Sequence, residues 1–118
     1  METNQTEYTF DCKKLWSYLR NIFESRIVIL DGGMGTALQK YKFEEEDYRG
    51  EMFKGHKSEL KNNSDILCFT QPDTIREIHE GYLEAGADII ETNTFNGNSI
   101  SQSDFDLESI VYDVNVKA

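Results

Sequence analysis

Long apolar runs, cysteine pairs and an excess of basic residues are all missing from this sequence. No apolar stretch approaches the ~18 residues of a membrane-spanning helix, and the first 25 residues are too polar and acidic for a signal or transit peptide. The two cysteines, Cys12 and Cys68, form neither a CxxC pair nor a disulfide framework. These absences predict a cytoplasmic protein with no membrane partner.

Basic side chains are outnumbered by acidic ones. The chain has 12 Lys and Arg against 22 Asp and Glu, a net charge of −10. Nucleic acids and anionic membranes bind basic faces, so this balance argues against both as main partners. Hydrophobic residues at 38% and aromatics at 12% are enough for a packed core in a chain of 118 residues, the usual size of one domain.

Regular structure is predicted in five places. Apolar residues recur with a helical period in residues 13–23, in the stretch that follows Pro72 and ends near Gly86, and in residues 107–118. Residues 26–31 and 87–95 are short apolar runs without alternation, which is typical of strands buried on both faces. Residues 44–65 are charged and lack a period, so we expect a long surface connection there.

Helices that alternate with strands indicate parallel βα units and an α/β fold. Two strands do not complete a sheet, and the last helix reaches Ala118 without a glycine or proline stop signal. We therefore expect a fragment of a larger architecture.

Glycine is concentrated at one place, the end of the first expected strand. Three of the eight glycines lie within residues 32–35, and the second expected strand ends in the polar run Glu91–Phe95. Ligands of parallel α/β proteins collect at such strand ends. Two readings stay open: a glycine turn and nothing more, or a concavity of N–H groups that binds an anion.

Nucleotide and metal patterns fail. No Lys-Ser/Thr pair follows the glycines, and Leu38 stands where the dinucleotide pattern requires its last glycine. His56 and His79 are 23 positions apart, and neither cysteine has a ligand partner at a useful spacing. His79 is expected on a helix face, Cys68 in the core and the run EEED (44–47) in a solvated loop.

Four segments together resemble the homocysteine S-methyltransferase family, and within it the branch of cobalamin-dependent methionine synthases. They are RIVILDGGMGT (26–36), YKFEEEDYRGEMFKGH (41–56), the run from LKNNSDILCFTQPD to ADIIETNTFN (60–96), and SISQSDFDLESIVYDVNVKA (99–118). DGGMGT and ADIIETNTF occur across the family. EDYRGEMFK and NNSDILCFTQPD point to the cobalamin-dependent branch.

The resemblance implies an α/β fold, namely the first two βα units of an incomplete (β/α)8 TIM barrel preceded by an N-terminal helix. Residues 1–25 would be a leader and residues 26–118 part of the homocysteine-binding domain. In the full-length enzyme zinc and cobalamin are the cofactors, but their ligands are not among the matching positions. The partners implied are homocysteine and the remaining domains of that enzyme.

The resemblance also implies roles for individual residues. The first-strand motif borders the amino-acid end of homocysteine, the second-strand threonine hydroxyl helps to hold the carboxylate, and the residues around it line the same mouth. The substrate-binding residues expected on this basis are Asp31, Gly32, Gly33, Thr92, Phe95, Glu91 and Asn93.

The function implied is transfer of a methyl group from methylcobalamin, supplied by 5-methyltetrahydrofolate, to homocysteine, giving methionine. The chain by itself is expected to be inactive, because the zinc ligands that would hold the thiolate are absent. Three alternatives remain: another homocysteine S-methyltransferase, a non-catalytic binding or interaction module, and a phosphate-binding α/β enzyme.

Overall fold

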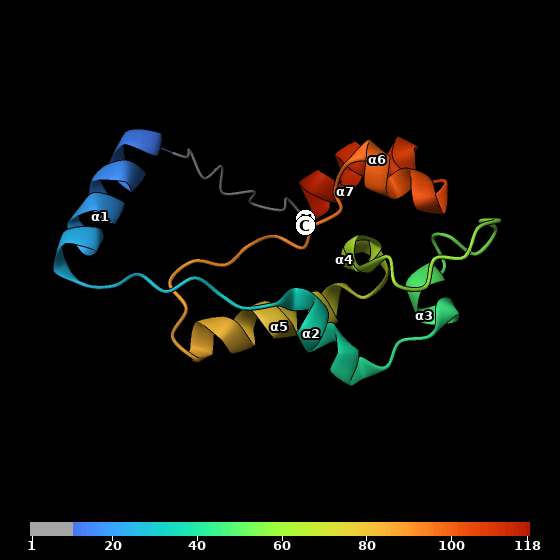
Figure 1. Cartoon of the computed structure of the whole chain (residues 1–118), viewed down its shortest axis with the longest axis horizontal. Helices are drawn as coiled ribbons and strands as arrows, with labels where there is room; N and C mark the ends of the chain where they lie inside the picture. The colour runs from blue at the N-terminus through green and yellow to red at the C-terminus, as the bar shows by residue number, and fades with distance from the viewer. Residues whose placement is uncertain (1–10) are drawn as a thin grey trace, which may run out of the picture.

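Helices supply all the regular secondary structure of residues 11–118, the part of the chain that this computed structural model describes (Figure 1). The first ten residues of the expected leader lie outside the described residues. The α-helices are α1 (Cys12–Ser25), α2 (Met34–Leu38), α3 (Glu45–Arg49), α4 (Leu67–Thr70), α5 (Pro72–Glu84), α6 (Ser99–Gln102) and α7 (Val111–Lys117). The 3₁₀ turns are η1 (Gln39–Tyr41), η2 (Ser64–Ile66), η3 (Ser103–Phe105) and η4 (Glu108–Ile110).

The two long helices confirm the periodicity of the sequence. Helix α1 begins after Asp11, whose side chain accepts hydrogen bonds from Lys13 N at 3.0 Å and Lys14 N at 3.2 Å. Helix α5 has Pro72 at its first position, where no N–H partner is needed. It ends before Gly86, whose φ of 109° is a conformation that glycine adopts without strain. The third expected helix is shorter than predicted and starts with the turn η4.

The expected α/β fold is wrong: residues 11–118 contain no strand and no sheet, and so no βα unit of a TIM barrel. The segments 26–31 and 87–95 are extended and lie side by side, but they share a single parallel bridge between Leu30 and Ile89. Hydrogen bonds from Asp31 N to Ile89 O (2.9 Å) and from Asp88 N to Ile29 O (2.8 Å) flank it.

The physical reason is the lack of cover on these two segments. Side chains of Ile27, Ile29 and Leu30 are 84%, 52% and 52% exposed. A parallel sheet is stable when helices cover both its faces, and nothing among the described residues covers these. The apolar runs correctly indicated extended backbone and a parallel pairing, whereas the buried sheet that they were expected to enter is not formed.

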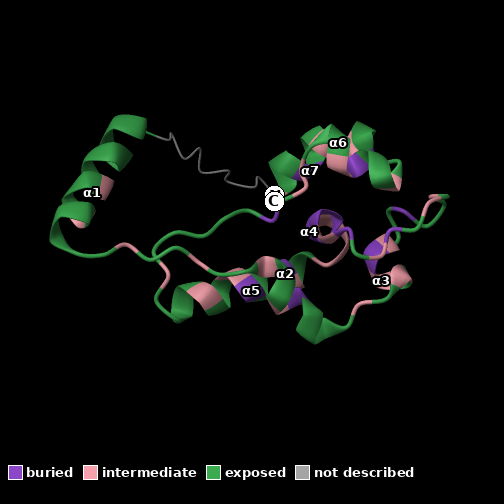
Figure 2. Ribbon diagram, viewed as in Figure 1, coloured by how far each residue is buried: buried purple, intermediate pink, exposed green. Residues whose placement is uncertain are grey.

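The core lies instead in the middle of the chain. Figure 2 shows buried residues on α4 and on parts of α3 and α5. The cluster comprises Leu38, Tyr48, Phe53, Leu60, Ile66, Leu67, Ile75, Ile78 and Leu107. The expected surface connection at residues 44–65 is therefore wrong, since it supplies three of these side chains.

Charged residues fold that connection into the core. Glu45, expected in a solvated loop, accepts hydrogen bonds from Leu60 N (2.9 Å) and Lys61 N (2.6 Å). Arg49 pairs with Glu45 at 2.6 Å and donates to the carbonyl oxygens of His56 and Ser58. These bonds satisfy loop backbone groups that would otherwise be buried without partners, so a segment without periodicity still packs.

Helix α1 stands apart from this core (Figure 1) and buries none of its residues. The radius of gyration, 16.9 Å, accordingly exceeds the about 13.5 Å of a compact domain of this length. None of the helices in residues 11–118 is long and apolar enough to cross a membrane.

One aromatic contact joins α5 to the glycine segment. The Tyr82 hydroxyl donates to Gly33 O at 3.1 Å. A Cβ added to Gly32 would lie 2.8 Å from Cε1 of the same ring, whereas one added to Gly35 would meet nothing within 4 Å. Gly32 is therefore required by the close approach of Tyr82.

We expect Gly32→Ala to displace the Tyr82 ring and break its hydrogen bond, at a cost of about 1 kcal/mol in the free energy of unfolding. Gly35→Ala is the matched control and should not destabilise the protein, because position 35 lies within α2, where alanine is the better helix former, and an added Cβ meets nothing within 4 Å. Urea denaturation of both variants, repeated with Tyr82→Ala, gives a double-mutant cycle. A full cost for Gly32→Ala in the Tyr82→Ala background would contradict the assignment.

The Arg26–Asp88 ion pair predicts a pH dependence of stability. Arg26 contacts both carboxylate oxygens of Asp88, at 2.7 and 2.8 Å, and Ile29 N donates to Asp88 at 2.9 Å. The Arg26 hydrogen bonds, followed by that of Ile29, lower the pKa of Asp88 from 3.8 to about 2. The unfolded chain therefore takes up this proton first as the pH falls, and the contribution to stability is present above about pH 4 and is lost on the way down to about pH 2.

Asp88→Asn should remove that part of the pH dependence while it keeps an acceptor for Ile29 N. The measurement is the thermal midpoint of both proteins between pH 2 and pH 6, with Asp113→Asn, at an exposed position of α7, as the control. The change is expected to be small because the pair is at the surface. Parallel curves for wild type and Asp88→Asn would contradict this role of Asp88.

Candidate functional site

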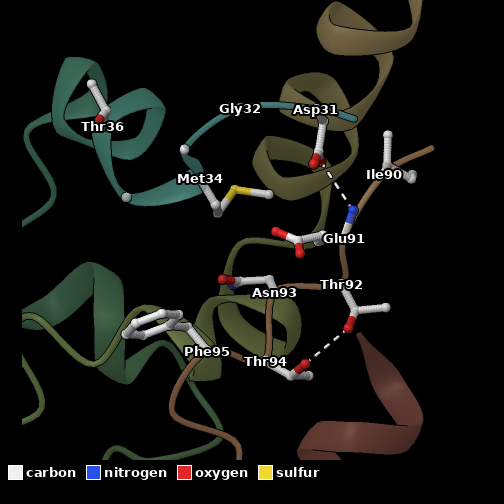
Figure 3. Close-up of a pocket in the computed structure, with 12 residues that line it drawn as sticks. Asp31, Gly32, Met34, Thr36, Ile90, Glu91, Thr92, Asn93, Thr94 and Phe95 are labelled. Atoms are coloured by element: carbon white, nitrogen blue, oxygen red, sulfur yellow. Dashed lines mark hydrogen bonds between the residues drawn. The ribbon is translucent and has the colours of Figure 1, made fainter. Parts of the chain in front are cut away.

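An open pocket of about 1000 Å³ lies where the two extended segments end. Its lining consists of residues 31–36 and 90–95, and therefore of both polar stretches singled out in the sequence (Figure 3). All seven expected substrate-binding residues are among them. Although no sheet is formed, the parallel bridge at Leu30 and Ile89 brings the two ends to one place.

Asp31 links the two halves of the lining. Its Oδ2 accepts a hydrogen bond from Glu91 N at 3.1 Å, as the dashed line in Figure 3 marks. Its Oδ1 is buried and has no hydrogen-bond partner among residues 11–118. A carboxylate oxygen in that state is costly unless a donor reaches it. Asp31 therefore has an unused acceptor, which a ligand donor reaches when the atoms that cover Oδ1 move.

Two threonine hydroxyl groups of residues 90–95 contact each other. Thr92 Oγ1 and Thr94 Oγ1 are 2.8 Å apart, and either can be the donor (Figure 3). Each hydroxyl carries one proton, and their mutual bond uses only one of the two. The other proton is available to an acceptor in the pocket.

The remaining expected residues differ in exposure. Asn93 is 4% exposed, and its amide nitrogen donates to Ser64 O at 2.7 Å, so that this group is already engaged within the protein. Phe95 is 95% exposed and offers an apolar ring at the mouth. Gly32 and Gly33 line the pocket next to Asp31, although Gly32 also has the packing role given to it by Tyr82.

The charge of the lining has one sign. Among the described residues that line it, the ionisable side chains are those of Asp31 and Glu91, and none is Lys or Arg. Such a pocket favours a ligand with a cationic group.

The described residues do not form a site for a zinc ion. No three His, Cys, Asp or Glu side chains of residues 11–118 lie close enough together to hold a metal ion. Cys12 is exposed, whereas Cys68 is a buried core residue, as expected, and its thiol donates to Asp65 O. Burial, followed by the charge of Asp65, raises the pKa of Cys68 to about 11, so this thiol stays protonated and is a poor ligand.

Several residues at the site were missed from the sequence. Met34 and Ile90 add apolar surface to the pocket, and Asp65, Asn63 and Gln102 lie buried beneath the segment 91–96. The run NNSD (62–65) directly before the apolar ILCF (66–69) was the available signal. Polar side chains beside a buried run are buried with it and then need partners.

One known protein family matches this sequence. The sequence model described as homocysteine S-methyltransferase matches residues 28–118, which is most of the chain and includes both pocket segments. Enzymes of this family transfer a methyl group to homocysteine. With the match covering more than half of its residues, this chain belongs to the homocysteine S-methyltransferase family.

Proposed function

We propose that the pocket formed by residues 31–36 and 90–95 binds homocysteine for methyl transfer to its sulfur, giving methionine. The observation that carries the proposal is the carboxylate of Asp31, which lines the pocket and has one oxygen, Oδ1, without a partner among residues 11–118. The charged side chains that the described residues contribute to the lining are carboxylates. An α-ammonium group supplies both the donor and the charge that this arrangement lacks.

The carboxylate of homocysteine needs donors instead. The Thr92–Thr94 pair has one hydroxyl proton not used between the two side chains. Asp31 and this pair come from different segments of the same lining. We therefore place a zwitterionic amino acid between them, with its ammonium group at Asp31 and its carboxylate at the two threonines. A phosphate or nucleotide would bring only negative charge next to Asp31 and Glu91, which makes the alternative of a phosphate-binding enzyme less favourable.

The specific branch proposed is that of the cobalamin-dependent methionine synthases. It rests on the resemblance of residues 46–54 and 62–73, which include the core residues Tyr48, Phe53, Ile66 and Leu67. In that branch methylcobalamin is the methyl donor and zinc holds the thiolate. Because the described residues offer no zinc site, the part assigned to them is to bind and orient the amino acid.

The chain is divided into two parts at residue 26 in this proposal. Residues 26–118 are proposed as the homocysteine-binding unit, and residues 1–25 as a leader. Helix α1 buries none of its residues and precedes the family match, which begins at residue 28.

Removing the charge of Asp31 should weaken binding of homocysteine. Asp31→Asn keeps an oxygen for Glu91 N but replaces a charge-assisted contact by a neutral one, and the Kd should rise about tenfold. Thr92→Val should raise it less, by about threefold. The measurement is isothermal titration calorimetry with homocysteine under reducing conditions, with Asp73→Asn on the exposed side of α5 as the matched control.

Titration with AMP and inorganic phosphate separates the alternatives. Binding of phosphate or AMP but not of homocysteine would overturn the proposal. An unchanged Kd for homocysteine in Asp31→Asn would overturn the assignment of the ammonium group to Asp31.

A further inference from the structure

Beneath the pocket lies a set of polar side chains that are almost completely inaccessible to solvent. Asn63, Asp65 and Gln102 are 1%, 1% and 0% exposed, and none of them lines the pocket. Polar groups at this depth are costly unless they are hydrogen-bonded. Their partners therefore indicate what they stabilise.

The partners converge on one residue, Asn96, which directly follows the pocket segment. Asn96 N donates to Asp65 Oδ1 at 2.9 Å, and Gln102 Nε2 donates to Asn96 O at 3.1 Å. Both backbone groups of Asn96 are thus held by buried side chains. Asn63 in turn fixes the Gln102 amide, with bonds of 2.8 and 3.2 Å between the two side chains.

The same stretch of chain holds the pocket segment at a second point. Ser64, between Asn63 and Asp65, accepts the hydrogen bond of the Asn93 amide at 2.7 Å. Residues 63–65 and Gln102 therefore fix positions 93 and 96, on either side of Thr94 and Phe95. At the other end of the segment, Asp31 holds Glu91 N. The conformation of the pocket segment is set at both ends by side chains from other parts of the chain.

We propose that Asp65 and Gln102 are positioning residues for the pocket, which hold residues 91–95 in the conformation that binds the amino acid. The ligand named here rests on the proposed function. Asp65 reaches the pocket only through Asn96, so it is not a ligand itself. Burial raises the pKa of Asp65, because its charged form loses contact with water at this place.

The effect on affinity follows from the fraction of molecules in the binding conformation. If release of Asn96 leaves about one molecule in ten with the segment in place, the apparent Kd for the amino acid rises about tenfold. Helices α3 and α5 and their apolar contacts do not use Asn96, so they should keep their structure.

The test compares four variants by amide hydrogen exchange and by their affinity for homocysteine. Asp65→Val removes the acceptor of Asn96 N at similar volume, and Asp65→Asn restores an acceptor oxygen. Asp104→Val, at an exposed carboxylate of η3, is the matched control. Gln102→Met removes the second anchor without changing the Asp65 carboxylate, and serves if Asp65→Val does not fold.

The expected result is that exchange of the Asn96 amide is at least about tenfold faster in Asp65→Val and close to wild type in Asp65→Asn and Asp104→Val, with unchanged protection in α5. The homocysteine Kd should rise about tenfold in Asp65→Val and Gln102→Met and recover in Asp65→Asn. Wild-type exchange at Asn96 in Asp65→Val would overturn the proposal. Loss of protection throughout α5 in both Asp65→Val and Gln102→Met would overturn it as well, since these residues would then support the whole fold.

The two proposals fail in different ways. If wild type does not bind homocysteine, the proposed function fails, while the exchange of Asn96 still reports whether Asp65 holds the segment. If homocysteine binds and its Kd is unchanged in a folded Asp65→Val, the positioning role fails and the proposed function stands.

Discussion

The site depends on the pairing of two segments that are far apart in the sequence. The bridge at Leu30 and Ile89, the bond from Glu91 N to Asp31 and the Arg26–Asp88 ion pair keep residues 26–33 beside residues 87–95. Without this pairing the glycine segment and the polar run would not share a pocket. Because the two paired segments are short and exposed, their position depends on the buried parts of the chain.

Those buried parts are the helices between the two segments. The apolar cluster on α3, α4 and α5 fixes where residue 87 leaves the core, and Tyr82 on α5 fixes the turn at Gly32. On the other side, Asp65 and Gln102 hold the chain where it turns away from the pocket at Asn96. The pocket is therefore an exposed feature supported from a well-packed neighbour, with apolar contacts giving stability and buried polar contacts giving position.

Sequence reasoning succeeded where the signal is local. Helices α1 and α5 follow from periodicity, capping and a terminal glycine, all of which act within a few residues. The grouping of Asp31, Thr92 and Glu91 followed from the polar ends of two apolar runs. The prediction of strands at residues 26–31 and 87–95 was wrong, because a sheet needs neighbouring strands and covering helices, which these residues lack here. The prediction of a surface connection at residues 44–65 was also wrong, because the hydrogen bonds and the ion pair of Glu45 and Arg49 hold this stretch against the core although it has no helical periodicity.

The sequence by itself determined the family, the two long helices and the identity of the residues around the pocket, because each is encoded in short runs of side chains. Only the tertiary structure decided that one oxygen of Asp31 has no partner, that Gly32 is needed by Tyr82, and that Asp65 holds Asn96. The last two depend on atoms separated by 50 and by 31 positions in the chain. Contacts over such separations form only when the chain packs, and no local pattern of residues encodes them.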